Sequence, residues 1–573
     1  MKTEISKRSC GRLCAAALAG LGLVLFSGQT PAGAANPMPQ VVTTNGHHAL
    51  FVDGAPYLIL GAQAHNSSAW PGTLPKVWAA MDDLHANTLE IPVYWEQFEP
   101  QPGKFDPSIV DLMIKGAREH NVRLVFLWFG TWKNGSSHYL PPWAKAHPDL
   151  YPRMMATNGT RIDSPSPFAP VAMKADMNAF SALMRHIKSV DPVHTVIMIQ
   201  VENEPGAWRA LRDFSPEAEK AFNAPVPADF LKALAGRNGA KSGSGNWREV
   251  FGDNADEYFH AWAVAHYIGQ VAAAGKAEYP LPMYVNAALR SPTGNPRAGT
   301  YETGGATDNV LDIWKAAAPA IDILCPDIYM NDSAGYLLVM DHYSRPDNTL
   351  FVPETGGTGN GSRMCFAALG RGAIGWSPFG LDYTRATPES VAPVGMNYRM
   401  LEPIMREVAR LNFQGKVKAV EEEAGQSVAT LDFGEWSAVI TWSSSGGGRG
   451  RRGGAPPAAA APAGARGAAA AGGEAAPSPM GRALVAQIST NQFFVTAAYC
   501  RIEFKAASGG QRDFLRVEEA EQLDRKPNAS HNGRDYSAAS AFRVMRILNG
   551  DETDNPLPFS SAPETLRVTL GTY

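Results

Sequence analysis

Short apolar segments alternate with longer stretches of helical spacing between Leu58 and Asp382. A buried strand followed by an amphipathic helix produces this rhythm, so the pattern predicts βα units around a parallel sheet. The candidate strands span residues 57–62, 88–93, 123–128, 195–201, 283–287, 321–326, 349–353 and 372–377. Eight such strands match a (β/α)₈ barrel, an α/β fold, which we place at residues 36–415.

The pattern changes in two other parts of the chain. About 80 residues separate the fourth and fifth candidate strands, and they include a Gly/Ser-rich stretch at 236–245 and a helix-like run at 256–274. Beyond Gly415, alternating apolar and polar residues predict strands at 427–431, 437–442, 493–499, 542–547 and 565–570. We therefore expect a C-terminal β-sandwich at 416–573. A Gly/Ala/Pro-rich insert at 443–479, which has few apolar side chains to bury, is expected to be disordered.

The N-terminus has the features of a secretory leader. Four basic residues precede an apolar run at 14–26, and small residues follow at 32–34. The pattern predicts a signal peptide at residues 1–34 and a periplasmic or secreted protein. A retained membrane anchor is the alternative, although the apolar run is shorter than the roughly 20 residues that span a bilayer.

Composition excludes several functional classes. The 573 residues carry 51 basic and 55 acidic side chains, a net charge of −4, which is too balanced to favour nucleic acid or an anionic membrane. Beyond the leader only Cys325, Cys365 and Cys500 remain, too few for a disulfide scaffold. We find no metal-ligand spacing and predict no cofactor. The oligomeric state is left open.

Two glutamates follow apolar strands that lie far apart in the sequence. Glu204 ends the run Val196–Glu204, after Glu202 and Asn203, and Glu354 follows the segment at 349–353. Regular alternation would place Glu202 and Glu204 on one face, but Pro205 favours Glu204 as the residue that faces the site. In a barrel, both strand ends meet at the substrate-binding face.

A pair of carboxyls at one barrel mouth indicates glycoside hydrolysis. One carboxyl protonates the departing oxygen while the other attacks or stabilises the anomeric carbon. We therefore assign Glu204 as the general acid/base and Glu354 as the nucleophile, with Asn203 placed to bind the sugar 2-hydroxyl.

These segments resemble the retaining glycosidases whose acid/base and nucleophile lie on strands four and seven, and most closely the β-galactosidases of glycoside hydrolase family 35. The family motifs are matched by Gln200 to Glu204, by Trp95, Glu99, Pro100 and Gly103, and by Leu140, Pro141 and Trp143. Residues 141–149 are also similar to family 42 β-galactosidases. The chain also resembles a bacterial subgroup of family 35 enzymes that have an appended β-domain.

The resemblance implies release of terminal, non-reducing β-D-galactose from oligo- or polysaccharides by double displacement. Three departures, at Pro92, at Pro205 and in the loop 132–135, make galactose specificity less secure than hydrolysis. Another retaining β-glycosidase and a non-catalytic carbohydrate-binding barrel are the alternatives. The further substrate-binding candidates are Tyr329, expected to hydrogen-bond the nucleophile, Trp376 and Trp95, aromatic residues near strand ends, and His65 and Asn66, which follow strand one.

Overall fold

The computed structural model describes residues 36–237, 243–330, 332–357, 359–443, 480–522 and 542–573. Residues 36–573 form one compact unit. The predicted leader and all but the first residue of the predicted insert at 443–479 lie outside the described residues. No helix in the described part combines the length and the apolar character needed to cross a membrane.

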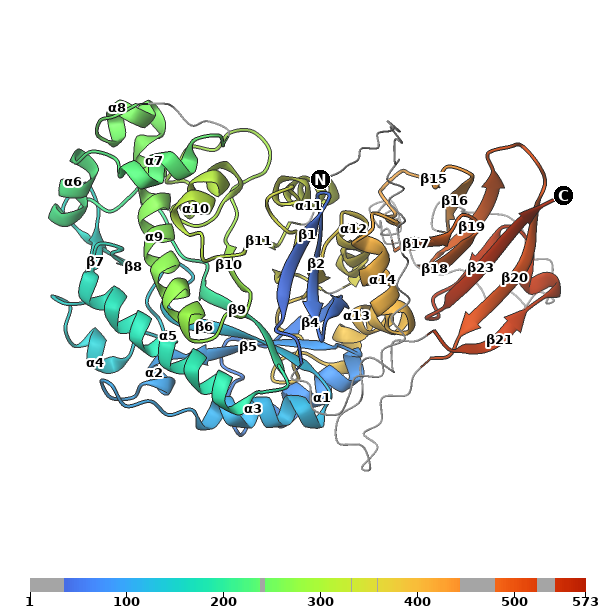
Figure 1. Cartoon of the computed structure of the whole chain (residues 1–573), viewed down its shortest axis with the longest axis horizontal. Coiled ribbons are helices and arrows are strands. Elements are labelled where there is room, and N and C mark those ends of the chain that lie inside the picture. Colours follow the sequence, from blue (N-terminus) through green and yellow to red (C-terminus); the bar gives the residue numbers. More distant parts are fainter. Residues whose placement is uncertain (1–35, 238–242, 331, 358, 444–479, 523–541) are drawn as a thin grey trace, which may run out of the picture. The chain divides into compact units, whose positions relative to one another are not determined.

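Eight parallel strands form a barrel in the part of the chain that precedes the C-terminal sheets (Figure 1). They are β4 (Ile59–Gln63), β5 (Thr88–Tyr94), β6 (Arg123–Lys133), β9 (Val196–Asn203), β10 (Met283–Ala287), β11 (Ile323–Ile328), β12 (Glu354–Thr355) and β13 (Gly375–Trp376). From β4 to β12 each strand pairs with the next, and β13 pairs with β4. The bridge between Val352, just before β12, and Trp376 of β13 joins the two ends and closes the ring. The predicted barrel is therefore confirmed.

Helices follow the strands as the sequence pattern predicts. They include α1 (Leu74–Leu84), α3 (Ser108–Glu119), α5 (Pro170–Val190), α9 (Ala255–Glu278), α10 (Leu311–Ala317), α11 (Ser333–Tyr343), α12 (Met364–Gly370), α13 (Pro388–Leu401) and α14 (Met405–Asn412). In α3 the buried residues Ile109, Val110, Met113 and Ile114 recur at helical spacing, so one face packs inward. A capping box of Thr387 with Ser390, and a proline in the first turn, begin α13.

The seam between β13 and β4 depends on glycine. A Cβ atom on Gly61 would lie 1.9 Å from Ser377 Oγ, and one on Gly375 would lie 2.3 Å from Ile59 Cβ. The two backbones therefore approach more closely than side chains allow. The seventh strand also begins later than predicted, at Glu354 rather than in 349–353, because Pro353 has no N–H to donate to a ladder.

The long segment between β9 and β10 is helical. It contains α6 (Pro216–Asn223), α7 (Ala228–Leu234), α8 (Trp247–Phe251) and α9, which includes the predicted run 256–274. The shorter elements of the barrel region are β1 (Gln40–Thr44), β2 (His47–Val52), β3 (Ala55–Tyr57), α2 (Trp95–Phe98), α4 (Pro142–Lys145), β7 (Arg153–Met155) and β8 (Arg161–Pro165).

Two antiparallel sheets make up the C-terminal domain. One contains β14 (Val417–Glu421), β17 (Arg482–Ser489), β18 (Gln492–Ala498), β23 (Thr565–Thr572), β20 (Arg512–Ala520) and β21 (Val544–Leu548); the other contains β15 (Val428–Asp432), β16 (Trp436–Trp442), β19 (Cys500–Ala506) and β22 (Leu557–Phe559). Ile440 and Ile502 from the second sheet share an apolar core with Val485 and Val568 from the first. This is the predicted sandwich, and all five predicted strands are present.

Candidate active site

Glu204 stands directly after β9, whose eight residues are all buried. Its backbone is held on two sides. The N–H of Gly135 donates to the Glu204 carbonyl at 2.9 Å, and the Glu204 N–H donates to Oδ1 of Asn286 on β10 at 2.9 Å. The carboxyl is therefore delivered to the barrel mouth by a braced segment, as the sequence predicts.

The backbone at this strand end departs from regular β geometry. Glu202 and Glu204 have φ angles of +64° and +41°, in the left-handed region that side chains other than glycine rarely adopt. Opposite Glu202, four residues of β6, Phe129–Trp132, lie between the pairs Trp128↔Val201 and Lys133↔Asn203, three more than in a regular ladder. Such strain is typical of functional sites and is held in place by surrounding contacts.

This geometry separates Glu202 from Glu204, which regular alternation would have placed together. The Glu202 carboxyl is fully buried, accepts the Trp132 N–H at 2.6 Å and lies beside Asp176. Burial, and then the charge of Asp176, raise the pKa of Glu202 well above its usual range. Glu202 is therefore a buried structural acid, and Glu204 is the site-facing member of the pair.

Glu354 lies on β12 and is 7% exposed. Tyr329 donates its hydroxyl to Oε1 of Glu354 at 2.7 Å, and Gln63 of β4 donates Nε2 to Oε2 at 3.0 Å. Both oxygens thus accept a hydrogen bond, which fixes the orientation of the carboxyl group. The predicted contact of Tyr329 with this glutamate is confirmed.

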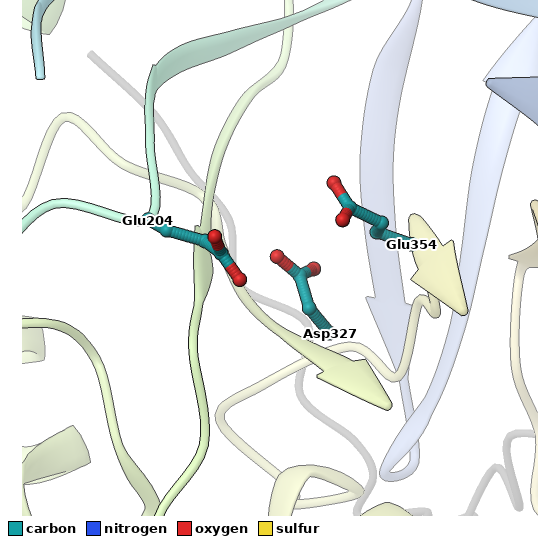
Figure 2. A group of neighbouring side chains, drawn as sticks. All are labelled: Glu204, Asp327 and Glu354. Atoms are coloured by element: carbon teal, nitrogen blue, oxygen red, sulfur yellow. The ribbon is translucent and has the colours of Figure 1, made fainter. Parts of the chain in front are cut away.

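Asp327 on β11 brings a third carboxyl to the same place. Figure 2 shows the carboxyl groups of Glu204, Asp327 and Glu354 turned toward one another. One oxygen from each lies within 4.8 Å of the others. The two glutamates, which are 150 residues apart in sequence, therefore converge at the mouth of one barrel.

The environment keeps Glu204 protonated to an unusually high pH. Burial, and then the charge of Glu354, raise the pKa of Glu204 from 4.5 to about 7, although Lys133 and Asp327 lower it. A carboxyl with such a pKa can donate a proton near neutral pH and accept one afterwards.

Asn203 and Lys133 form a buried polar pair beside Glu204. Lys133 Nζ donates to Asn203 Oδ1 at 2.7 Å, while Asn203 Nδ2 has no partner in the described part of the chain. Glu302 lies near them and is 1% exposed. Burial, and then the charge of Glu204, raise the pKa of Glu302 well above its usual range.

His65 and Asn66 follow β4, as predicted, and are partly buried. The His65 backbone N–H and Nδ1 lie 2.6 and 3.1 Å from Oδ2 of Asp382. The Asn66 carbonyl accepts the hydroxyl of Tyr139 at 3.3 Å. Their proposed contact with sugar hydroxyls stays a prediction.

Trp95 and Trp376, by contrast, are core residues in this structure. Trp95 has no exposed surface and donates Nε1 to Glu99 at 2.7 Å, and Trp376 is 1% exposed and donates Nε1 to Tyr336 at 3.1 Å. Neither ring presents a face on which a sugar could stack. The prediction that they bind substrate is wrong for this conformation because neighbouring elements cover both rings.

Sequence reasoning missed several residues of the site, namely Gln63, Lys133, Asn286, Glu302 and Asp327. Asp327 directly follows the sixth predicted strand, the same signal that identified the two glutamates. Gln63 likewise follows the first predicted strand. Asn286 lies inside the fifth, and Glu302 lies in a long loop with no distinguishing pattern.

The three carboxyls are close enough to be considered as ligands of a metal ion, and they are the one such group found among the described residues. The protein already supplies donors to three of their six oxygens: both oxygens of Glu354 and Oδ2 of Asp327 accept hydrogen bonds. Calcium and magnesium sites usually combine carboxylates with carbonyl oxygens and water. The donor set therefore fits acid–base chemistry better than cation binding.

Comparisons with known proteins give limited similarity. A family model described as a domain of unknown function (DUF5597) matches residues 394–560, the end of the barrel region and most of the sandwich. The comparison with curated proteins gave no match.

Among solved structures, the chain is similar to a β-galactosidase from Bacillus circulans sp. alkalophilus, with 13% identity and a TM-score of 0.45 over 61% of this chain and 57% of that one. It is also similar to the exo-β-1,4-mannosidase Op5Man5 from Opitutaceae bacterium strain TAV5, with 16% identity and a TM-score of 0.38 over 65% of this chain and 63% of that one. The catalytic domain of a β-amylase from Paenibacillus polymyxa gives 12% identity and a TM-score of 0.43 over 58% of this chain and 96% of that one.

The chain covers less than two thirds of the galactosidase and of the mannosidase. Similarity at these identities and TM-scores carries no functional argument. The function therefore has to be argued from this chain's own residues.

Proposed function

We propose that this chain is a retaining glycoside hydrolase in which Glu354 is the nucleophile and Glu204 the general acid/base. The observation that carries the proposal is the approach of their carboxylate oxygens to within 4.8 Å. Retaining enzymes hold the two carboxyls about 5–5.5 Å apart, whereas inverting enzymes need about 6.5–9.5 Å to admit a water molecule. The spacing supports double displacement.

In the first step Glu354 attacks the anomeric carbon, and the bond to the leaving oxygen breaks as Glu204 donates its proton to that oxygen. The pKa of about 7 supports the role of acid near neutral pH. The hydrogen bonds from Tyr329 and Gln63 support an oriented nucleophile. A glycosyl ester of Glu354 and a free alcohol result.

In the second step water attacks the anomeric carbon, the ester bond breaks, and Glu204 takes a proton from the water. Forming the ester has removed the negative charge of Glu354, which is one cause of the raised pKa of Glu204. That pKa therefore falls in the intermediate, so the same side chain is ready to act as a base.

We infer a substrate with a terminal, non-reducing β-D-galactose, carried on an oligo- or polysaccharide outside the cytoplasm. Galactose rests on the resemblance of Gln200 to Glu204 to the family 35 motif, and the location rests on the leader. Asn203 Nδ2 and Gln63 Oε1 support a ligand rich in hydroxyl groups, because both are buried at the site without a partner among the described residues.

The test is to trap the intermediate with a 2-fluoro-β-galactoside and to map the labelled peptide. We expect time-dependent inactivation, label on Glu354, and a first product with the same anomeric configuration as the substrate. Label on Asp327 would show that Glu354 is not the nucleophile.

A panel of nitrophenyl β-glycosides tests the sugar. Turnover of another β-glycoside but not of the galactoside would overturn galactose while keeping the reaction. Absence of turnover with every member, together with sugar binding by calorimetry, would favour the non-catalytic barrel. Glu354→Gln is the control, because it should abolish turnover and leave sugar binding largely intact.

A further inference from the structure

Asp327 is a carboxyl for which double displacement by two glutamates has no assigned role. It is 3% exposed and lies on β11, between the strands that carry Asn286 and Glu354. Figure 2 shows its carboxyl between those of Glu204 and Glu354. One oxygen of Asp327 lies within 4.8 Å of an oxygen of each glutamate.

Asn286 links Asp327 to the segment that carries Glu204. Its Nδ2 donates to Oδ2 of Asp327 at 2.6 Å, and its Oδ1 accepts the backbone N–H of Glu204 at 2.9 Å. One amide therefore sets the position of both groups. Oδ1 of Asp327 is buried and accepts no hydrogen bond from the described part of the chain, so it is free to share a proton with a neighbouring carboxyl.

The surroundings of Asp327 supply little positive charge. The ionisable groups that interact with it are the carboxyls of Glu204 and Glu354, the Lys133 ammonium, the hydroxyls of Tyr284, Tyr329 and Tyr343, and the Cys325 thiol. Lys133 is the one cation in this set. Three ionised carboxyls would thus leave uncompensated negative charge in a buried volume, which is costly.

We propose that Glu204 and Asp327 hold one proton between them, so that Asp327 is a positioning residue that keeps the last proton of the pair available to the leaving group. This inference rests on the proposed glycosidase function. Two buried carboxyls whose oxygens lie within 4.8 Å of one another cannot both ionise readily, as in proteins where a carboxyl pair shares a proton. Burial, followed by the charges of Glu354 and Glu204, raises the pKa of Asp327 well above its usual range, in agreement with this arrangement.

The proton count closes over the cycle. Before the reaction Glu354 carries one negative charge and the Glu204–Asp327 pair carries one. When the leaving oxygen takes the proton, the pair becomes doubly ionised, while Glu354 becomes a neutral ester. The total charge of the three groups is unchanged, so no additional charge has to be buried. Water then returns a proton to the pair as the ester is hydrolysed.

The test is the pH dependence of kcat/KM for Asp327→Asn with lactose, whose sugar leaving group needs a proton. A protonated Asp327 lowers the pKa of Glu204 by hydrogen bonding to it, but once the pair has a single proton left, the charge of the ionised partner holds that proton. Without the second carboxyl, this last proton should be lost at lower pH. We expect the alkaline limb to move down by about one pH unit or more. At about pH 8, above both limbs, kcat/KM should thus be about tenfold below that of wild type, since one pKa unit is a factor of ten. Asp327→Ser should shift the limb in the same direction and serves if the amide variant does not fold.

Three comparisons make the result decisive. Asp327→Glu keeps a carboxyl and should keep the wild-type limb, even if kcat falls. Glu302→Gln removes another buried carboxyl near Glu204, and an equal shift there would overturn the assignment to Asp327. Nitrophenyl β-galactoside needs little protonation of its leaving group, so its profile should hardly change.

An unmoved alkaline limb in both Asp327→Asn and Asp327→Ser, with wild type active on lactose, would overturn the shared proton alone. Wild-type protein that hydrolyses neither substrate would instead overturn the proposed function. The two failures are thus distinguishable.

Discussion

Glu90 offers a quantitative test of how the barrel interior treats a charge. It lies on β5 with no exposed surface, and the hydroxyl of Tyr284 donates to its Oε2 at 2.7 Å. Burial raises the pKa of Glu90 from 4.5 to about 8, even though Ser377 and Tyr284 lower it. At neutral pH the folded protein therefore holds a neutral Glu90, whereas the unfolded chain ionises it.

The sign of the effect on stability follows from this difference. Below pH 4.5 Glu90 is protonated in both the folded and the unfolded state, so its protonation does not affect the free energy of unfolding. As pH rises from there toward about 8, folding must take up a proton, and the free energy of unfolding falls by about 1.4 kcal/mol per pH unit. At pH 7 the loss is on the order of 3 kcal/mol.

Glu90→Gln should remove this loss, because an amide has the shape of the protonated carboxyl and still accepts from Tyr284. We expect urea denaturation to show a gain on the order of 3 kcal/mol at pH 7 that disappears at or below pH 4.5. Glu119→Gln, at an exposed helical site where the Lys115 pair spans 3.8 Å, is the control and should show no such gain. A stability difference for Glu90→Gln that does not change with pH would refute the reasoning.

Three further substitutions test the site. Tyr329→Phe removes the 2.7 Å hydrogen bond to the proposed nucleophile, and kcat/KM should fall about 10–100-fold, since hydrogen bonds to charged groups contribute about 1.5–3 kcal/mol; a change below about twofold on nitrophenyl β-galactoside would contradict the role. Glu204→Ala should lower kcat/KM for lactose by about 10²–10⁴ and for the nitrophenyl substrate much less, and added azide should yield galactosyl azide; equal losses on both substrates would remove Glu204 as the acid. Gly135→Ala places a Cβ 2.3 Å from Oε1 of Glu302 at a φ of +67°, whereas Gly159→Ala, at +80°, meets nothing within 4 Å. In both variants the free energy of unfolding should fall by about 1–2 kcal/mol because of the left-handed backbone, and thermal denaturation should show a larger fall for Gly135→Ala. Equal falls would contradict the close approach to Glu302.

Periodicity alone predicted the barrel strands, although the seventh begins just beyond its predicted range, and five of the ten sandwich strands. Burial on a sheet leaves a pattern that a short window of sequence contains. The two glutamates were found for a related reason: a polar residue that ends an apolar strand lies at a barrel mouth. The same rule would have found Asp327, one residue beyond the predicted end of its strand.

Other features depend on contacts that no local pattern records. Trp95 and Trp376 follow or end strands in the sequence, but both are buried, and their partners Trp128 and Tyr336 come from other parts of the chain. Glu202 and Glu204 have the spacing of side chains on one face, yet positive φ angles turn them apart. The bulge of β6 that accompanies this turn involves residues about 70 positions away in sequence.

The proposed nucleophile stands on one of the two shortest strands of the barrel. β12 and β13 each contain two residues, and Val352 supplies a single bridge across the junction between them. A ladder this short does little to orient the side chain of Glu354. Its orientation depends instead on hydrogen bonds from Gln63 on β4 and from Tyr329 just after β11. These two strands lie on either side of β12 in the strand order of the barrel. The position of the reacting carboxylate oxygen therefore depends on β4 and β11 as well as on β12. A change in the register of either strand would displace this oxygen without any substitution on β12.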